Sequence, residues 1–120
     1  MTMPTLVERV TAALEPLDIP IKDPAGIQAL RGPFIHVSFA GGTKNVRKML
    51  SVEVAVFTQW VTQIRGHAEL EKLMRRILPV LDAAPGMLLD SWTGAEELSQ
   101  GDDEPEVDWI TATITVTEPF

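Results

Sequence analysis

The chain has 120 residues, a formal net charge of −7, a composition typical of one globular domain, and no cysteine. The absence of cysteine excludes disulfides, thiolate nucleophiles and cysteine-ligated metal sites. The acidic balance disfavours unspecific nucleic-acid binding, which requires clustered Lys and Arg. The first residues do not have the pattern of a signal peptide, and no stretch approaches the roughly 18 apolar residues of a membrane span, so we expect no membrane association.

The charge is distributed unevenly along the chain. Residues 1–76 hold all ten Lys and Arg residues and seven carboxylates, a balance of +3. Residues 77–120 hold ten carboxylates and no Lys or Arg, a balance of −10. This asymmetry predicts a folded subunit with one basic and one acidic surface.

The first predicted element is a helix over residues 3–17, where leucine and valine recur at three- and four-residue spacing. Thr2 is the predicted N-cap, with Pro4 in the first turn, a position that tolerates proline. The stretch 19–26 contains two prolines and a glycine and is predicted to be an extended turn.

Two alternating stretches follow, over residues 33–40 and 50–57. Apolar side chains occupy one face of each stretch, and polar or small side chains occupy the other. This period of two is typical of half-buried strands. The connection between them, residues 41–48, therefore predicts an antiparallel hairpin.

The hairpin loop raises the question of phosphate binding, because it reads Gly-Gly-Thr-Lys from Gly41 to Lys44. A P-loop has the spacing G-x-x-x-x-G-K-[ST] and opens a helix, whereas this loop lacks that spacing and leads into a predicted strand. We interpret it as a hairpin turn whose tip carries Lys44, Arg47 and Lys48. Three cations without an aromatic partner do not favour nucleic-acid recognition, so we expect no sequence-specific contact with nucleic acid.

The second half begins with residues 58–66, which fit either a continued strand or a loop. A helix is predicted over residues 67–84 from its wide apolar stripe. Pro79 within this helix predicts a kink or a new turn, because proline lacks a backbone donor. A strand over residues 87–96, with a turn near Gly94, follows.

The last strand, residues 109–117, has the clearest alternation, with isoleucine, alanine and valine facing inward and threonines facing outward. The order of helix, strand pair, helix and strand pair predicts a single domain, residues 1–120, of the α+β class. We expect a mostly antiparallel sheet of four to five strands with two helices packed on one face. The threonine face is expected to be partly solvated or used for contact.

No group of residues predicts catalysis. The acidic run 102–108 fits either a calcium site or a solvated loop, and the absence of EF-hand spacing favours the loop. His36 and His67 lack metal-ligand spacing, and the serines lack the G-x-S-x-G elbow. We therefore expect no enzymatic activity, no metal and no cofactor.

The three tryptophans, Trp60, Trp92 and Trp109, fit either packing within the sheet or a protein interface, where tryptophan is enriched. Trp109 is predicted to lie opposite Ile110, among the threonines, and is the preferred interface residue. Charged loops complete the predicted surface. The predicted interface residues are Lys44, Arg47, Lys48, Asp102, Asp103, Glu104 and Trp109.

Nearly the whole chain resembles the tail terminator (tail completion) proteins of long-tailed bacteriophages, the minor-tail-protein-U-like family. The resemblance follows the order and character of four segments: "TLVERVTAALEPL", "PFIHVSFAGG…MLSVEVAVFT", "HAELEKLMRRILPVLDAA" and "DWITATITVTEPF". It implies a small structural subunit that forms a hexameric ring. The ring would stop growth of the tail tube and join the tail to the head connector.

The resemblance also implies partners and a location. The partners are further copies of the chain, the tail tube protein and the head–tail connector protein. The location is the head-proximal end of the virion tail, after assembly in the host cytoplasm.

A ring requires a head-to-tail, heterologous interface, for which the basic and acidic halves of the chain are complementary. We expect the acidic run to face a basic surface, either residues 44–48 of the neighbouring subunit or the next protein in the tail. Two other classes stay open. One is another head–tail joining or tube protein on a related fold. The other is a small ligand-binding α+β domain or enzyme, which would require a deep pocket with convergent polar groups.

Overall fold

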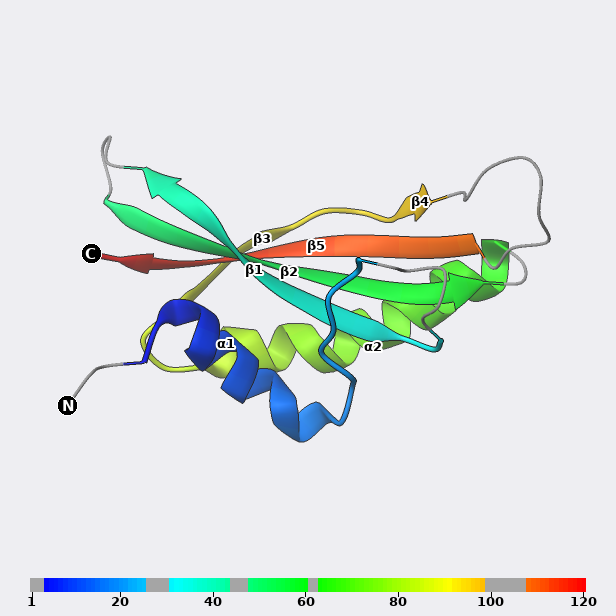
Figure 1. The fold of residues 1–120 in the computed structure, drawn as a ribbon, viewed down its shortest axis with the longest axis horizontal. Helices are drawn as coiled ribbons and strands as arrows, with labels where there is room; N and C mark the ends of the chain where they lie inside the picture. Colours follow the sequence, from blue (N-terminus) through cyan, green and yellow to red (C-terminus); the bar gives the residue numbers. More distant parts are fainter. Residues whose placement is uncertain (1–3, 26–30, 44–47, 61–62, 99–107) are drawn as a thin grey trace.

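The computed structural model describes residues 4–25, 31–43, 48–60, 63–98 and 108–120. Five strands form one antiparallel sheet, and two helices cover one of its faces (Figure 1). The predicted α+β class and antiparallel sheet are confirmed. The elements after the first helix are β1 Phe34–Thr43, β2 Met49–Trp60, α2 Gln63–Ala83, β3 Leu88–Trp92, β4 Glu96–Leu98 and β5 Asp108–Pro119.

The first helix, α1, spans Leu6–Leu14 and continues into a short 3-10 turn. Its N-cap is Thr5, so the prediction of Thr2 is wrong. Glu8 donates its backbone N–H to Thr5 Oγ1, and Thr5 donates its own N–H to Glu8 Oε1, both at 3.1 Å. This capping box satisfies two donors that the helix itself leaves free. The Thr5 N–H also holds the pKa of Glu8 below its ordinary value, because it stabilises the charged carboxylate.

Several boundaries differ from the periodicity-based predictions. β2 continues to Trp60 and α2 already begins at Gln63, so the undecided stretch 58–66 divides between strand and helix. Pro79 lies within α2, which continues to Ala83. The predicted strand 87–96 is two short strands, β3 and β4. No helix in the described part of the chain is long and apolar enough to cross a bilayer.

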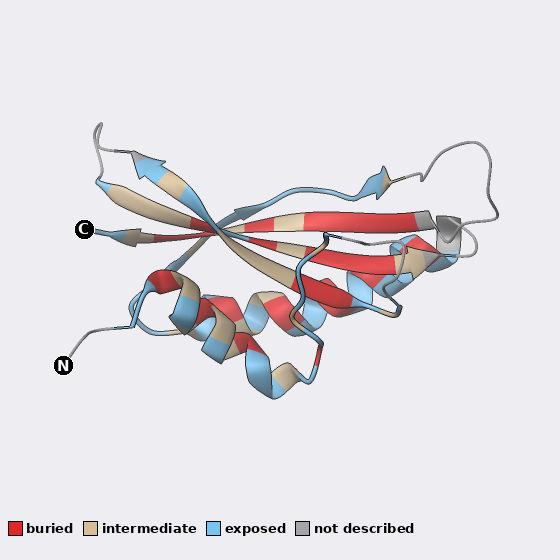
Figure 2. Ribbon diagram, in the orientation of Figure 1, coloured by how far each residue is buried: buried red, intermediate tan, exposed pale blue. Residues whose placement is uncertain are grey.

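The main core lies between the sheet and the helices. α2 packs against β2, β5 and β3, while α1 packs against β1 and α2. Burial is concentrated in β2 and β5, the two central strands of the sheet (Figure 2). Their alternate residues face the helices, as predicted for both strands. The buried residues of this row are Val52, Val54, Val56, Ile110, Ala112, Ile114 and Val116.

A second, aromatic cluster occupies the opposite face of the sheet. Phe34 stacks on Phe57 with ring centroids 4.6 Å apart, and Trp109 meets Phe34 edge-on at 5.3 Å. Trp109 lies opposite Ile110 as predicted, but it is only 1% exposed. The prediction that Trp109 anchors an interface is therefore wrong for this subunit, because its ring is used in packing. Thr111 and Thr117 on the same strand are also buried.

The predicted antiparallel hairpin is confirmed, but its two glycines lie inside β1, where Gly41 pairs with Ser51 and Gly42 with Leu50, so the prediction that they are turn residues is wrong. Gly41 has φ of +94°, a conformation that favours glycine, at a register shift between Phe39 and Gly41. A Cβ atom at Gly42 would lie 2.2 Å from the carbonyl oxygen of Met49. Both glycines thus allow close pairing of the strands near the hairpin tip.

Candidate assembly interface

The strand order converts the charge asymmetry of the sequence into an asymmetry across the sheet. The order is β1-β2-β5-β3, with β4 also paired to β5. The C-terminal strand β5 therefore lies inside the sheet, and β1 lies at the edge opposite β3 and β4. Since no Lys or Arg follows Arg76 in the sequence, the β3–β4 edge can contribute only acidic charges.

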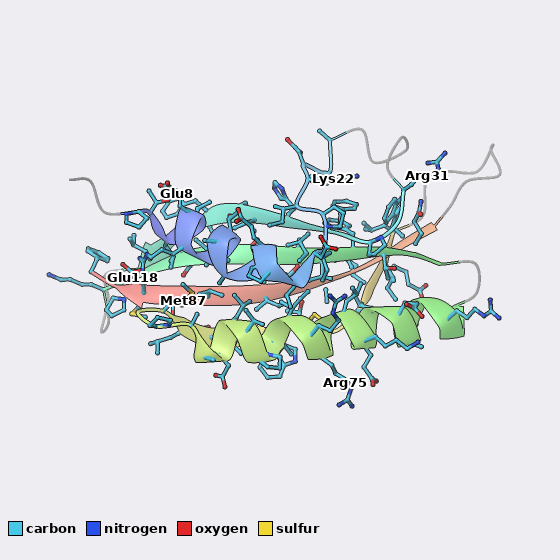
Figure 3. All side chains as sticks on the ribbon, turned by 90° about the horizontal axis from the view of Figure 1, so that it is seen from below. Glu8, Lys22, Arg31, Arg75, Met87 and Glu118 are labelled. Atoms are coloured by element: carbon cyan, nitrogen blue, oxygen red, sulfur yellow. The ribbon has the colours of Figure 1, made fainter. Side chains whose placement is uncertain are left out.

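The β1 edge carries exposed cations. A parallel bridge between Ile21 and Ile35 brings the preceding segment alongside β1, and it places Lys22 there, exposed to solvent. Arg31 and Lys48 are also exposed near this strand. Figure 3 shows Lys22 and Arg31 on the side of the molecule away from Arg75 on α2. This edge is the basic edge of the sheet.

One carboxylate interrupts the basic edge. Asp23 is exposed, and its Oδ1 accepts the backbone N–H of Ala25 at 2.9 Å. This hydrogen bond ties the carboxylate to its own turn. The cations of the basic edge therefore outnumber its described carboxylates.

The β3–β4 edge carries exposed carboxylates. The register shift between Leu89 and Ser91 leaves Asp90 in a bulge, and Asp90, Glu96 and Glu97 are exposed. Glu97 Oε1 lies 3.3 Å from His67 Nε2 at the start of α2. Charged side chains and bulges on an edge strand prevent indiscriminate pairing with other edges. This edge is the acidic edge.

Two of the four Lys and Arg residues of α2 pair with carboxylates of the same helix. Arg75 Nε donates to Glu71 Oε2 at 3.0 Å, and Lys72 Nζ donates to Glu69 Oε1 at 3.2 Å. Each of these cations is thus paired on its own helix.

Both edge strands also present large apolar side chains to solvent. Phe39 on β1 is 62% exposed, and Leu88 and Trp92 on β3 are 54% and 55% exposed. The remaining large exposed hydrophobic residue among those described is the C-terminal Phe120. Exposed apolar residues framed by charges are typical of protein–protein contact sites. The two edges are therefore the surfaces best suited to binding a partner.

A groove of about 290 Å³ opens beside Trp92, between the β3–β4 connection and α2. Its walls include Leu70 and Met74 of α2 and Ala112 of β5. Pockets for drug-sized ligands run from about 300 to 1,000 Å³ and contain a few convergent polar groups. This groove is at the lower limit of that size, and His67, Glu71 and Thr93 line it together with the apolar side chains. It is large enough to receive one side chain of a partner.

A second hollow, of about 460 Å³, lies next to α1 and is lined by Thr11, Glu15 and residues 18–21. Within the described ranges, no three His, Cys, Asp or Glu side chains are grouped so that they could hold a metal ion. Thr11 lines this second hollow and Thr93 lines the groove beside Trp92, and no serine is among the lining residues of either.

The predicted interface residues have different outcomes. Lys48 is exposed at the end of the β1–β2 hairpin, and its carbonyl oxygen accepts the N–H of Phe120 at 3.0 Å. Trp109 is buried. The other predicted interface residues lie outside the described ranges: Lys44, Arg47, Asp102, Asp103 and Glu104.

Sequence reasoning missed the exposure of Phe39, and it named Trp92 among the possible interface residues but preferred Trp109. The alternation of residues 33–40 predicts that Phe39 shares the face of the buried side chains, and in the structure it does lie on that face. It is exposed because β1 has no neighbouring strand on its outer side there among the described residues. The edge position of β1 is visible only in the strand order, and the strand order cannot be read from local periodicity.

No protein-family model matches the sequence, and no curated protein matches it. What the chain offers to a partner is therefore inferred from its own surfaces. These surfaces are a basic edge and an acidic edge on opposite sides of one sheet, each with an exposed aromatic residue.

Proposed function

We propose that the chain is a structural assembly subunit that joins further copies of itself head to tail in a closed ring and acts as a phage tail terminator. The observation that carries this proposal is the opposite charge of the two sheet edges. A head-to-tail contact requires two different, complementary surfaces on each subunit, and the basic and acidic edges are such a pair.

The same charges disfavour a two-fold dimer through either edge. A two-fold contact brings identical surfaces together. It would place Asp90 and Glu96 of one acidic edge against the same carboxylates of another, and like charges in contact are repulsive. Contacts between unlike edges repeat from copy to copy, and they produce a ring where the rotation between copies closes. Six subunits is the number that the family resemblance implies.

The position of the ring in a virion follows from the resemblance. A ring has two different faces, so one face can bind the last layer of the tail tube while the other binds the head connector. Bound in this way, the ring blocks addition of further tube subunits. Its partners are the tail tube protein and the connector protein.

Tube growth measures this function directly. We expect purified subunits, added to polymerising tube protein of the same phage, to limit tube length and to leave a ring at one end in negative-stain images. Tubes that grow to the same lengths, with bare ends, would contradict the proposal. Subunits incorporated along the whole tube would instead favour the tube-protein alternative. Glu69→Gln, an exposed change on α2 outside both edges, is the control and should cap normally.

A further inference from the structure

The open part of the β1 edge begins after Ile35. Ile35 donates its N–H to Pro20 O and accepts the N–H of Lys22 at its carbonyl oxygen, both at 2.8 Å and both away from β2. Backbone direction alternates along an antiparallel strand, so Val37 and Phe39 also direct their backbone groups outward. No strand of the described residues pairs with them on that side.

The β3 edge is open in the same way. Thr93 donates its N–H inward to Thr113 O at 2.9 Å, so the backbone of the preceding Trp92 points outward by the same alternation. Among the described strands, β3 pairs only with β5. Both edges thus offer outward-pointing backbone donors and acceptors, at Val37 and Phe39 on β1 and at Trp92 on β3, which a strand of another chain can complete.

The exposed aromatic residues lie on the same side of the sheet. Phe39 is paired with Val52, and Trp92 is paired with Ile114. Val52 and Ile114 are both buried in the core beneath the helices, and paired residues share one face of a sheet. If the sheet continued from one copy into the next, Phe39 would therefore lie on the side where the groove beside Trp92 opens.

We propose that β1 of one copy pairs with β3 of the next copy, so that the sheet runs on between subunits and Phe39 enters the groove beside Trp92. The occupant of each edge is a second copy of this chain, because the cations beside β1 then lie against Asp90 and Glu96 of its neighbour. This inference rests on the proposed ring and specifies which surfaces form its contact.

Engineered cysteines test the contact without interference from native thiols, because the native chain has no cysteine. Ser38 on β1 and Ser91 on β3 pair with Glu53 and Thr115 and so share the face opposite the helices. We expect a mixture of Ser38→Cys and Ser91→Cys subunits to form disulfide-linked dimers, since bonding requires Cα atoms within about 7 Å. Each variant alone should stay uncrosslinked. A short bis-maleimide extends the test to a register shifted by a residue or two.

Ser51→Cys is the matched control, because Ser51 shares that face but lies on β2, inside the sheet. It should not link to either variant. Linkage of Ser38→Cys or Ser91→Cys with itself, at the efficiency of the mixture, would overturn the unlike pairing. The native mass of the wild-type chain separates the two proposals: a ring without the mixed link refutes this contact alone, whereas monomer at every concentration refutes both the contact and the ring.

A second test uses the aromatic residue itself. Phe39→Ala should raise the dissociation constant between subunits about 30-fold, the effect of losing a side chain that fills a desolvated pocket. Phe120→Ala removes an equally exposed aromatic residue that lies beyond the end of β5, and it should change the constant little. Equal effects of the two substitutions, or none from Phe39→Ala, would overturn the proposal.

Discussion

Replacing Trp109 by alanine should remove a large part of the stability of the isolated subunit. Trp109 is 1% exposed and edge-on to Phe34, which in turn stacks on Phe57. A buried tryptophan removes about 150–250 Å² from water, which at about 25 cal/mol per Å² corresponds to about 4–6 kcal/mol. Measured losses for tryptophan or phenylalanine to alanine are about 3–5 kcal/mol. A domain has only about 5–15 kcal/mol of stability in total.

Urea denaturation followed by far-ultraviolet circular dichroism measures this loss, at concentrations where the chain is monomeric. We expect Trp109→Ala to lower the free energy of unfolding by about 4 kcal/mol. Trp109→Phe, which keeps an aromatic ring beside Phe34, should lose clearly less. A loss below about 1 kcal/mol for Trp109→Ala would refute the packing role, because surface substitutions have effects of that size.

The remaining predictions concern the acidic edge and the first helix. Trp92→Ala should cost at most about 2 kcal/mol of subunit stability, since about half of the ring is already exposed, yet it should weaken assembly measured by native mass spectrometry; normal assembly would contradict the interface role. Glu96→Gln should slow association and flatten its dependence on salt, because charge complementarity acts mainly on the association rate, whereas Glu69→Gln on α2 should match the wild type in the same stopped-flow light-scattering assay. The charged Glu8 carboxylate stabilises α1 fully above the ordinary carboxyl pKa of 4.5, and this contribution is lost as the pH falls through the lowered pKa of the folded state. Glu8→Gln should therefore flatten the acid side of the plot of melting temperature against pH. An unchanged plot would contradict this role of Glu8.

Local periodicity predicted the elements because it reports which face of a segment is buried. The alternation of apolar and polar residues in β5 and the apolar stripe in α2 were sufficient to predict a strand and a helix. The capping box was also readable, since Thr5 and Glu8 have the required three-residue spacing. The prediction of Thr2 places the start of the helix three residues too early.

The location of the interface was not readable from the same signals. Trp109 lies among threonines in the sequence. The pairing of Phe34 with Phe57, and of β2 with β5, places the two phenylalanine rings against Trp109 and buries it. Phe39 and Trp92 likewise carry no local mark of an edge position. The charge asymmetry was visible in the sequence, but its meaning depends on β5 lying between β2 and β3.

The most direct test of the head-to-tail ring is the native mass of the purified chain, measured over a range of concentrations and ionic strengths. Ring closure predicts one discrete assembly, about 79 kDa for six copies of the 13.2 kDa chain, in exchange with monomer and more populated at low salt. A limiting dimer would mean that identical surfaces meet. An open series of masses without a preferred size, or monomer under all conditions, would contradict a closed ring built from unlike edges.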